Sequence, residues 1–340
     1  MEFLKINGAH GEGGGQIIRS AIALSCITKK PIHIENIRKN RKVPGLRPQH
    51  LTAINILQKI ANAESTGVKL GSTELKFIPG EIENMDLVED IVTAGSIPLV
   101  LQVLIPVVAV SKKRLELKIK GGTDVLWSPT TDYTQHVLKE AYSRMGINFS
   151  LELIRRGYYP KGEGEIHLKV YPSSVKSTTF YKRKTKDAKL VCSFSKLRKD
   201  EIENKVKAIT RKLVEKDYAI DIKIKSEDAK DPGATLLVYS IDDHSIIGTD
   251  ALYNQKTCEF DLDIDDFVRS NSMDDNLADM LIVPASLSNE KMVLQVSKIT
   301  NHLETNLFVT SKITGCKYGI GKTANGYDVI IEGVSHSCIK

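Results

Sequence analysis

Apolar residues along the chain follow helical and strand spacing in an order that occurs twice in its first half. A glycine precedes an apolar helix, a short strand follows, and a second helix leads into two strands. In the first unit these elements are predicted at 16–27, 32–37, 49–61, 67–70 and 74–78. In the second unit they are predicted at 97–110, 114–119, 131–145, 148–155 and 164–170. Gly15 and Gly95, and the strand starts at 32 and 114, give the same spacing of about 80 residues, which indicates an internal repeat.

A third unit is predicted near the end of the chain, with helices at 277–286 and 302–313 and strands at 292–296 and 327–331. Its first strand starts 178 residues after the first strand of the second unit. This separation is roughly 95 residues longer than one period of the repeat. An inserted module at about 181–269, which opens with the basic run 181–184, accounts for this excess. Within it, strands are predicted at 189–194, 219–224, 236–239 and 246–252, and a helix at 200–216.

This organisation predicts an α/β (α+β) fold made of three repeated βαβαββ units and an inserted small α/β domain. We expect residues 1–180 to hold two repeats of a large domain and 181–269 to form the inserted domain. Residues 270–340 would then form the third repeat and complete the large domain. Fold class alone leaves the function open.

Composition narrows the class of protein. Of 340 residues, 41% are hydrophobic and 26% are charged, which excludes a disordered or collagen-like chain. The net charge of +6 permits a polyanionic partner without requiring one. The five cysteines form no CxxC pair, so a zinc knuckle or a dithiol redox site is not expected; they are Cys26, Cys192, Cys258, Cys316 and Cys338.

Other features of the sequence indicate the location of the protein in the cell. The first residues carry no signal-peptide pattern. The most apolar run, 97–110, is shorter than the ~20 residues that cross a bilayer, and we expect it to be a buried helix. Together with the unpaired cysteines, these features favour a cytoplasmic protein with no membrane segment.

A glycine-rich segment, 11–15, precedes the first helix. It matches neither the Walker loop nor the dinucleotide-binding fingerprint, and a flexible turn would also explain it. Free backbone N–H groups at the helix start suit a phosphate, however. An acid such as Glu12 can hold a metal there, and Arg19 lies one turn into the helix, where it can reach a phosphate.

A basic loop follows the next strand, with five Lys or Arg residues between positions 38 and 47. Such runs are usually solvated turns. Here Pro44 and Pro48 restrict the chain around Arg47, which favours fixed phosphate contacts.

Other conspicuous residues have structural interpretations. Gln102 lies within an apolar helix, where a buried amide needs a partner. Trp127, the single tryptophan, is expected to anchor its loop against the core, and 158–165 is expected to be a hairpin turn. His302 opens a helix whose dipole would lower its pKa and favour a neutral, nucleophilic imidazole, although a lone histidine is more often structural. The other seven histidines, among them His336, show no metal-ligand spacing.

Taken together, five segments resemble the RNA 3′-terminal phosphate cyclase family. They are GAHGEGGGQIIRSAIALS, IRKNRKVPGLRPQHL, TAGSIPLVLQ, GGTDVLWSPTTDY and NHLETN. The likeness covers about 1–180 and 270–320 and is weakest in the insert. It implies repeated βαβαββ units with a smaller inserted domain, as the spacing also predicts.

The resemblance implies that the chain converts an RNA 3′-phosphate to a 2′,3′-cyclic phosphate with ATP. His302, in the HxxTN pattern of the family, would attack the α-phosphate and become adenylated. AMP would pass to the RNA 3′-phosphate, and the ribose 2′-hydroxyl would then displace it. The implied partners are ATP, an RNA with a 3′-phosphate end and a divalent metal, Mg or Mn. The resemblance also allows a homo-oligomer.

By resemblance, the site residues fall into four groups. His302 is catalytic, and Glu12 holds the metal. RNA is expected at Arg38, Arg41 and Arg47. The nucleotide is expected at Glu12, Arg19, Arg38, Arg41, Gln49, Gln102, Pro129, Asn276, Leu277, Ala278, Asp279 and Met280.

Three positions depart from the family pattern. Glu163 replaces a glycine of a turn, while Asn276 and Met280 replace a histidine and a glutamine of the segment that touches the nucleotide. Family relatives without catalytic activity, which act in ribosome assembly, lack the histidine, so His302 favours an enzyme. A non-catalytic scaffold of ribosome biogenesis remains the alternative. An enolpyruvyl-transferase-like enzyme, with a similar repeat architecture, lacks a recognisable motif.

Overall fold

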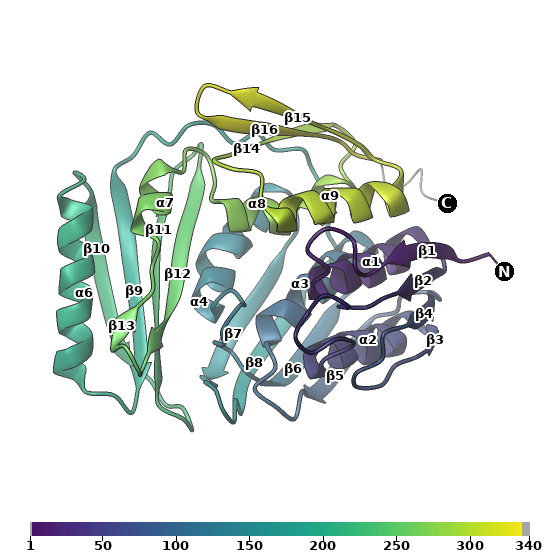
Figure 1. The fold of residues 1–340 in the computed structure, drawn as a ribbon, viewed down its shortest axis with the longest axis horizontal. Helices are drawn as coiled ribbons and strands as arrows, with labels where there is room; N and C mark the ends of the chain where they lie inside the picture. The colour runs from purple at the N-terminus through teal and green to yellow at the C-terminus, as the bar shows by residue number, and fades with distance from the viewer. Residues whose placement is uncertain (1, 335–340) are drawn as a thin grey trace.

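The computed structural model describes residues 2–334, and their first segment forms a four-stranded sheet with two helices (Figure 1). The elements are β1 (Leu4–Asn7), α1 (Gly15–Thr28), β2 (Ile32–Glu35), α2 (Pro48–Ala61), β3 (Glu64–Thr66) and β4 (Leu75–Ile78). The strand order is β1-β2-β4-β3, with β1 parallel to β2 and the other pairs antiparallel.

The second segment has the same strand order in its own sheet, β5-β6-β8-β7. Its strands are β5 (Met85–Asp90), β6 (Leu115–Gly121), β7 (Phe149–Arg155) and β8 (Gly164–Val170). Helix α3 (Ile97–Val110) joins β5 to β6. The helix predicted at 131–145 consists of α4 (Thr131–Tyr133), a π-helical turn (Thr134–Leu138) and α5 (Lys139–Arg144).

The third segment forms a three-stranded sheet of order β14-β16-β15. Its elements are α8 (Asp275–Ala285), β14 (Lys291–Val296), α9 (Asn301–Thr314), β15 (Lys317–Thr323) and β16 (Gly326–Glu332). This order matches the other two sheets without their first strand. The predicted α/β class is confirmed, and the threefold repeat stays a prediction that the strand orders support.

Between the second and third segments lies a five-stranded sheet, drawn at the left of Figure 1, of order β10-β9-β11-β12-β13. Its elements are β9 (Asp187–Ser195), α6 (Lys199–Val214), β10 (Ala219–Ser226), β11 (Gly233–Ile241), β12 (Ile246–Asn254), β13 (Glu259–Phe260) and α7 (Ile264–Arg269). Ile202, Val206 and Leu213 of α6 pack on this sheet in a core separate from that of the large domain. Two cores favour the predicted division of the chain, whose boundaries stay predictions.

Helix α1 lies at the centre of the large domain, packed against α2, α3 and α9. Nearly all its side chains are buried, as expected for a helix that is apolar around most of its circumference. Because α1 and α9 pack side by side, the glycine-rich loop before α1 lies against the first turns of α9 (Figure 1). This packing creates the candidate site described below.

Some predictions about local structure are wrong. The strand predicted at 67–70 is a turn bounded by Gly67 and Gly71, both with positive φ, and the actual strand is β3. Trp127 does not anchor its loop against the core: it is 93% exposed. The loop is held instead by Ser128, whose hydroxyl contacts that of Ser96 at 2.5 Å, and by Thr131.

Some predictions fall outside the described residues, namely those for His336, Cys338 and the last six positions of the third domain. Within residues 2–334, no helix is both long enough and apolar enough to cross a membrane.

Candidate active site

The glycine-rich loop and α9 touch closely. The backbone N–H of Glu12 donates a hydrogen bond to Oγ1 of Thr305 at 3.3 Å. Gly11 has a φ of +54°, and a Cβ at this position would collide with the Thr305 side chain. Glycine therefore allows the approach that brings Glu12 beside His302, the second residue of α9.

A chain of hydrogen bonds fixes the imidazole of His302. The amide nitrogen of Gln16 donates to both carboxylate oxygens of Asp279, at 2.5 and 2.6 Å. Its carbonyl oxygen consequently faces Nδ1 of His302 at 2.5 Å and can only accept a proton there. Neutral His302 is thus held as the Nδ1–H tautomer, which leaves the lone pair on Nε2.

The opposite nitrogen of His302 faces an acid. Nε2 lies 2.7 Å from Oε2 of Glu12, a contact that requires one proton between the two atoms, and the other oxygen of Glu12 forms an ion pair with Arg41. The Glu12 carboxylate favours a charged imidazole, but burial first, and then Arg19 and Arg41, lower the pKa of His302. The predicted lowering of this pKa is therefore confirmed in direction, while its causes are burial and two arginines.

A small cavity lies beside this histidine, lined by Gln16, Arg19, Gln102, Asp279 and Met280 among others. Within the described residues, the Arg19 guanidinium forms no hydrogen bond and no ion pair shorter than 4.0 Å. Burial lowers the pKa of Arg19 to about 10, with Asp279 acting in the opposite direction. Burial also raises the pKa of Asp279 to about 6. A partly buried, unpaired guanidinium favours an anionic ligand.

The basic loop, residues 38–47, leads into a residue that contacts the start of α1. His50 sits against Gly15, and its Nδ1 accepts from the backbone N–H of Arg47 at 3.1 Å. Burial, followed by Arg19, Arg38 and Arg47, lowers the pKa of His50 to about 3, so this histidine is neutral. His50 therefore adds no positive charge to that of the nearby arginines.

The three arginines predicted to contact phosphates differ in whether their side chains are already bound within the protein. Arg41 is exposed and bound to Glu12, and Arg47 precedes the first turn of α2. Arg38 donates through Nη1 to the carbonyls of Val43 and Gly45, at 2.9 and 3.0 Å, so it also holds the loop together.

Other predicted nucleotide residues lie outside the cavity. Gln49 lies beside Gly95, Pro129 is in the loop before α4, and Asn276 is exposed at the start of α8. The side chains of Leu277 and Ala278 are fully buried in the core, so only their backbone could meet a nucleotide.

Glu12 is the one residue predicted from the sequence to hold a metal. In residues 2–334, no cluster of three or more His, Cys, Asp or Glu side chains could hold a metal ion. Magnesium is commonly bound by one or two carboxylates together with substrate phosphates. A single acid near arginines fits that arrangement and does not fit a cage built from protein ligands only.

Two functional residues, Gln16 and Asn306, were not predicted from the sequence. Asn306 donates to the backbone carbonyl and Oδ1 of Asp279 at 2.9 and 3.3 Å, and it accepts from the Ser20 hydroxyl at 2.6 Å. A signal was present, because His302 and Asn306, like Gln16 and Ser20, are four residues apart and therefore share one face of their helices.

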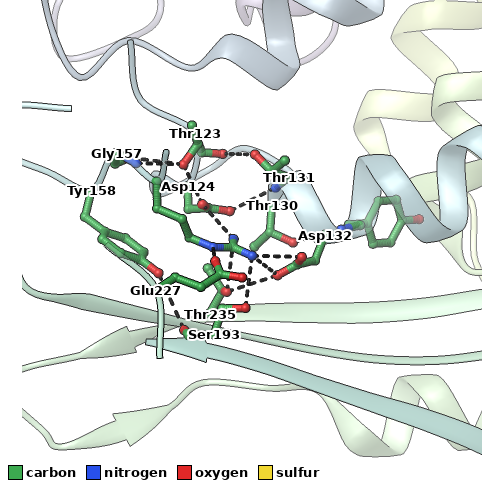
Figure 2. A network of polar contacts seen from close by, with 12 residues as sticks. Thr123, Asp124, Thr130, Thr131, Asp132, Gly157, Tyr158, Ser193, Glu227 and Thr235 are labelled. Atoms are coloured by element: carbon green, nitrogen blue, oxygen red, sulfur yellow. Dashed lines mark hydrogen bonds and ion pairs between the residues drawn. The ribbon is translucent and has the colours of Figure 1, made fainter. Parts of the chain in front are cut away.

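A second polar cluster joins the large and inserted domains around Arg156, which is 1% exposed. Figure 2 shows the cluster, with Asp124, Asp132 and Glu227 among its labelled residues. Its Nη1 donates to Asp124 at 3.0 Å and its Nη2 to Asp132 at 2.8 and 2.9 Å, both in the large domain. From the inserted domain, Glu227 binds Nε, and Ser193 accepts at 3.0 Å. These carboxylates outweigh burial and raise the pKa of Arg156. Every nitrogen of this guanidinium is engaged, so the cluster is structural.

Comparison with known proteins adds independent evidence. A sequence model for the family described as "RNA 3′-terminal phosphate cyclase" matches residues 10–320. A protein of that name from Methanosarcina barkeri is 37% identical over 333 residues, covering 97% of this chain and 100% of the relative. The namesakes from Pyrococcus abyssi and Thermococcus kodakarensis are 38% and 39% identical, covering 92% and 93% of this chain and 94% of each relative. Among solved structures, the enolpyruvyl transferase NikO from Streptomyces tendae aligns with a TM-score of 0.42 at 9% identity, over 99% of this chain and 49% of that one.

Proposed function

This chain belongs to the RNA 3′-terminal phosphate cyclase family, and we propose that it converts an RNA 3′-phosphate into a 2′,3′-cyclic phosphate at the expense of ATP. His302 is the nucleophile of this proposal. The observation that carries it is the hydrogen-bonded chain from Asp279 through Gln16 to Nδ1 of His302. That chain leaves Nε2 as the atom with a free electron pair.

In the first step, Nε2 of His302 attacks the α-phosphorus of ATP. A nitrogen–phosphorus bond forms, the bond to the bridging oxygen breaks, and diphosphate leaves. Arg19 and Arg41 are close enough to the imidazole to lower its pKa, so they can also neutralise the phosphates. Glu12 would hold a divalent cation, Mg²⁺ or Mn²⁺, together with those phosphates, and the ion supplies further charge neutralisation when bound.

In the second step, an oxygen of the RNA 3′-phosphate displaces the imidazole, which regenerates His302 and leaves AMP on the RNA. The ribose 2′-hydroxyl then attacks the 3′-phosphorus. AMP departs, and the hydroxyl proton is released to solvent. Activation is needed because an unmodified phosphate oxygen is a poor leaving group.

The remaining nucleotide residues of this proposal are Gln49, Gln102, Pro129, Asn276, Leu277, Ala278, Asp279 and Met280, with RNA phosphates at Arg38, Arg41 and Arg47. In addition to any ligand contact, Asp279 orients Gln16. The scaffold of ribosome biogenesis is not favoured, because a scaffold has no need of an oriented imidazole. A cytoplasmic location and a homo-oligomer remain predictions.

The test is to incubate the protein with ATP labelled at the α-phosphate and Mg²⁺ or Mn²⁺, and then to denature it. We expect a protein-bound label that is labile in acid and stable in alkali, and cyclisation of a 3′-phosphorylated oligonucleotide. His302→Asn should lose both, whereas His136→Asn, which changes another half-buried histidine, should keep both. Full labelling of His302→Asn would contradict the assignment, and an unlabelled wild-type protein that still binds RNA would favour the scaffold.

A further inference from the structure

Four large apolar side chains are exposed where three loops of the second segment meet. Val92 is 82% exposed, Leu126 66%, Trp127 93% and Tyr159 76%. We call this set the aromatic tip. Trp127 is the only tryptophan of the chain, and large aromatic side chains normally contribute to a core or an interface. Exposed apolar groups gathered in one place indicate a binding surface.

The three loops are in backbone contact. The N–H of Gly122 donates to the carbonyl of Gly95 at 2.9 Å, and the N–H of Thr123 donates to that of Gly157, also at 2.9 Å. A Cβ at Gly162, in the hairpin that carries Tyr159, would lie 2.8 Å from Cα of Ala94. The loops that carry the aromatic tip therefore lie side by side, although its residues are up to 67 positions apart.

The loop holds Trp127 outward by fixed contacts. Trp127 itself has a φ of +60°, a conformation that non-glycine residues keep only when their surroundings enforce it. Ser128 contacts Ser96 at 2.5 Å, and the next fixed point is the N–H of Thr130, which donates to Asp250 at 2.6 Å. The indole thus projects from an ordered loop, which lowers the entropy lost when a ligand stacks on it.

Helix α3 connects the loops of the aromatic tip to the candidate active site. Ser96 caps α3, and Gln102, which lines the cavity of Arg19 and Asp279, lies six residues further along the same helix, about 9 Å along the axis. On the other side, Gly95 touches Gln49, two residues after Arg47. Lys161 is exposed beside Tyr159 and forms no ion pair with the residues of segment 2–334.

We propose that Trp127 and Tyr159 form a stacking platform for the bases of single-stranded RNA that precede the 3′-terminal nucleotide, with Lys161 near their phosphates. This rests on the proposed function, because it takes the RNA end as the substrate of the adjacent site. Aromatic faces combined with positive charge are the usual means of binding single strands without sequence preference. The platform would let the protein accept many RNA ends while it binds more than the terminal nucleotide.

Trp127 provides its own probe, since it is the only indole in the chain. Titration with a single-stranded octanucleotide that ends in a 3′-phosphate should quench tryptophan fluorescence, and a nucleoside 3′-monophosphate should not. In cyclisation assays, Trp127→Ala should raise the KM for the octanucleotide about 5- to 100-fold, as expected for loss of one stacked base. Trp127→Phe should restore most of the affinity, and Leu70→Ala, which changes an exposed apolar side chain outside the aromatic tip, should behave as wild type.

The outcomes separate this proposal from the proposed function. Self-adenylation with ATP uses no RNA, so Trp127→Ala should retain it. If wild type fails to become adenylated but RNA still quenches Trp127, the proposed function is wrong and the platform stands. Unquenched fluorescence together with an unchanged KM in Trp127→Ala would overturn the platform. An effect of equal size on the mononucleotide would also overturn it, because it would mean that Trp127 acts on the terminal nucleotide itself.

Discussion

Two arginines of the fold differ in their hydrogen bonds and in the direction of their pKa shifts. Arg156 is fully buried, hydrogen-bonded to acids of both domains, and has a raised pKa. Arg19 is partly buried, forms no such bond in the described part of the chain, and has a pKa lowered to about 10. A buried cation that is fully paired holds parts of a protein together. One that is left unpaired in a cavity is available to a ligand, so the first arginine is structural and the second belongs to the candidate site.

The largest expected effect tests the structural half of this comparison. Arg156→Met should lower the free energy of unfolding by about 3–5 kcal/mol, because Asp124 and Asp132 would remain buried without the cation that balances their charge. Urea denaturation would measure the loss. Arg155→Met, at the neighbouring and less buried position, is the matched control and should cost far less. A loss below about 1 kcal/mol for Arg156→Met would mean that the cluster is not a structural link.

The second prediction tests the other half. Arg19→Met should reduce the rate of self-adenylation by about 10²–10³-fold, because a preorganised charge is lost where phosphate charge is neutralised. Its stability should change by no more than about 1 kcal/mol, since no hydrogen bond is broken. Labelling rates and urea denaturation would be compared on the same sample. If Arg19→Met unfolds as easily as Arg156→Met, the two arginines do not differ in role.

A third prediction concerns an acid beside the Arg156 cluster. Burial raises the pKa of Asp250 to about 6, so the folded protein retains a proton that the unfolded chain releases near pH 4. Stability should therefore fall as pH rises from about 4 to 6. Asp250→Asn should flatten this slope and be about 1–2 kcal/mol more stable than wild type at pH 8. Asp243→Asn, at an exposed position, serves as control. An unchanged slope would show that burial does not raise the pKa of Asp250 in the folded protein.

The smallest expected effect is on His302. Because burial, Arg19 and Arg41 lower its pKa, its imidazole should titrate by NMR below the ordinary value of about 6.5. It should therefore be mostly neutral at pH 7, and self-adenylation should decline only as pH falls below that titration. Arg19→Met should move the titration upward by less than about one unit. No movement would place Arg19 too far from His302 to share its ligand.

The helices could be predicted closely because their apolar spacing is long and regular. Helices α1, α2, α3 and α9 begin and end within one residue of the predicted bounds. Strands β1, β5 and β15 were missed for a physical reason. Every residue of β15 is exposed and half of the residues of β5 are acidic, so backbone pairing, which the sequence does not display, holds these strands in place.

The site was predictable in part. Residues of local motifs, such as Glu12 and His302, could be chosen from their segments, and the structure brings them together. Gln16 and Asn306 gain their roles from the packing of α1, α8 and α9, which no single segment encodes. Arg156 was missed because its acids come from two domains. Trp127 was misjudged because burial is the usual fate of a tryptophan.

The contact between Glu12 and His302 bears on the interval between turnovers. While Nε2 shares a proton with Glu12, the imidazole offers no electron pair to stray electrophiles. We infer that the resting protein is shielded from wasteful modification and becomes reactive when a ligand draws Glu12 or Arg41 aside. Acylation of His302 by diethyl pyrocarbonate should accordingly be slower in wild type than in Glu12→Gln. Glu12 would then keep Nε2 of His302 covered until a ligand binds.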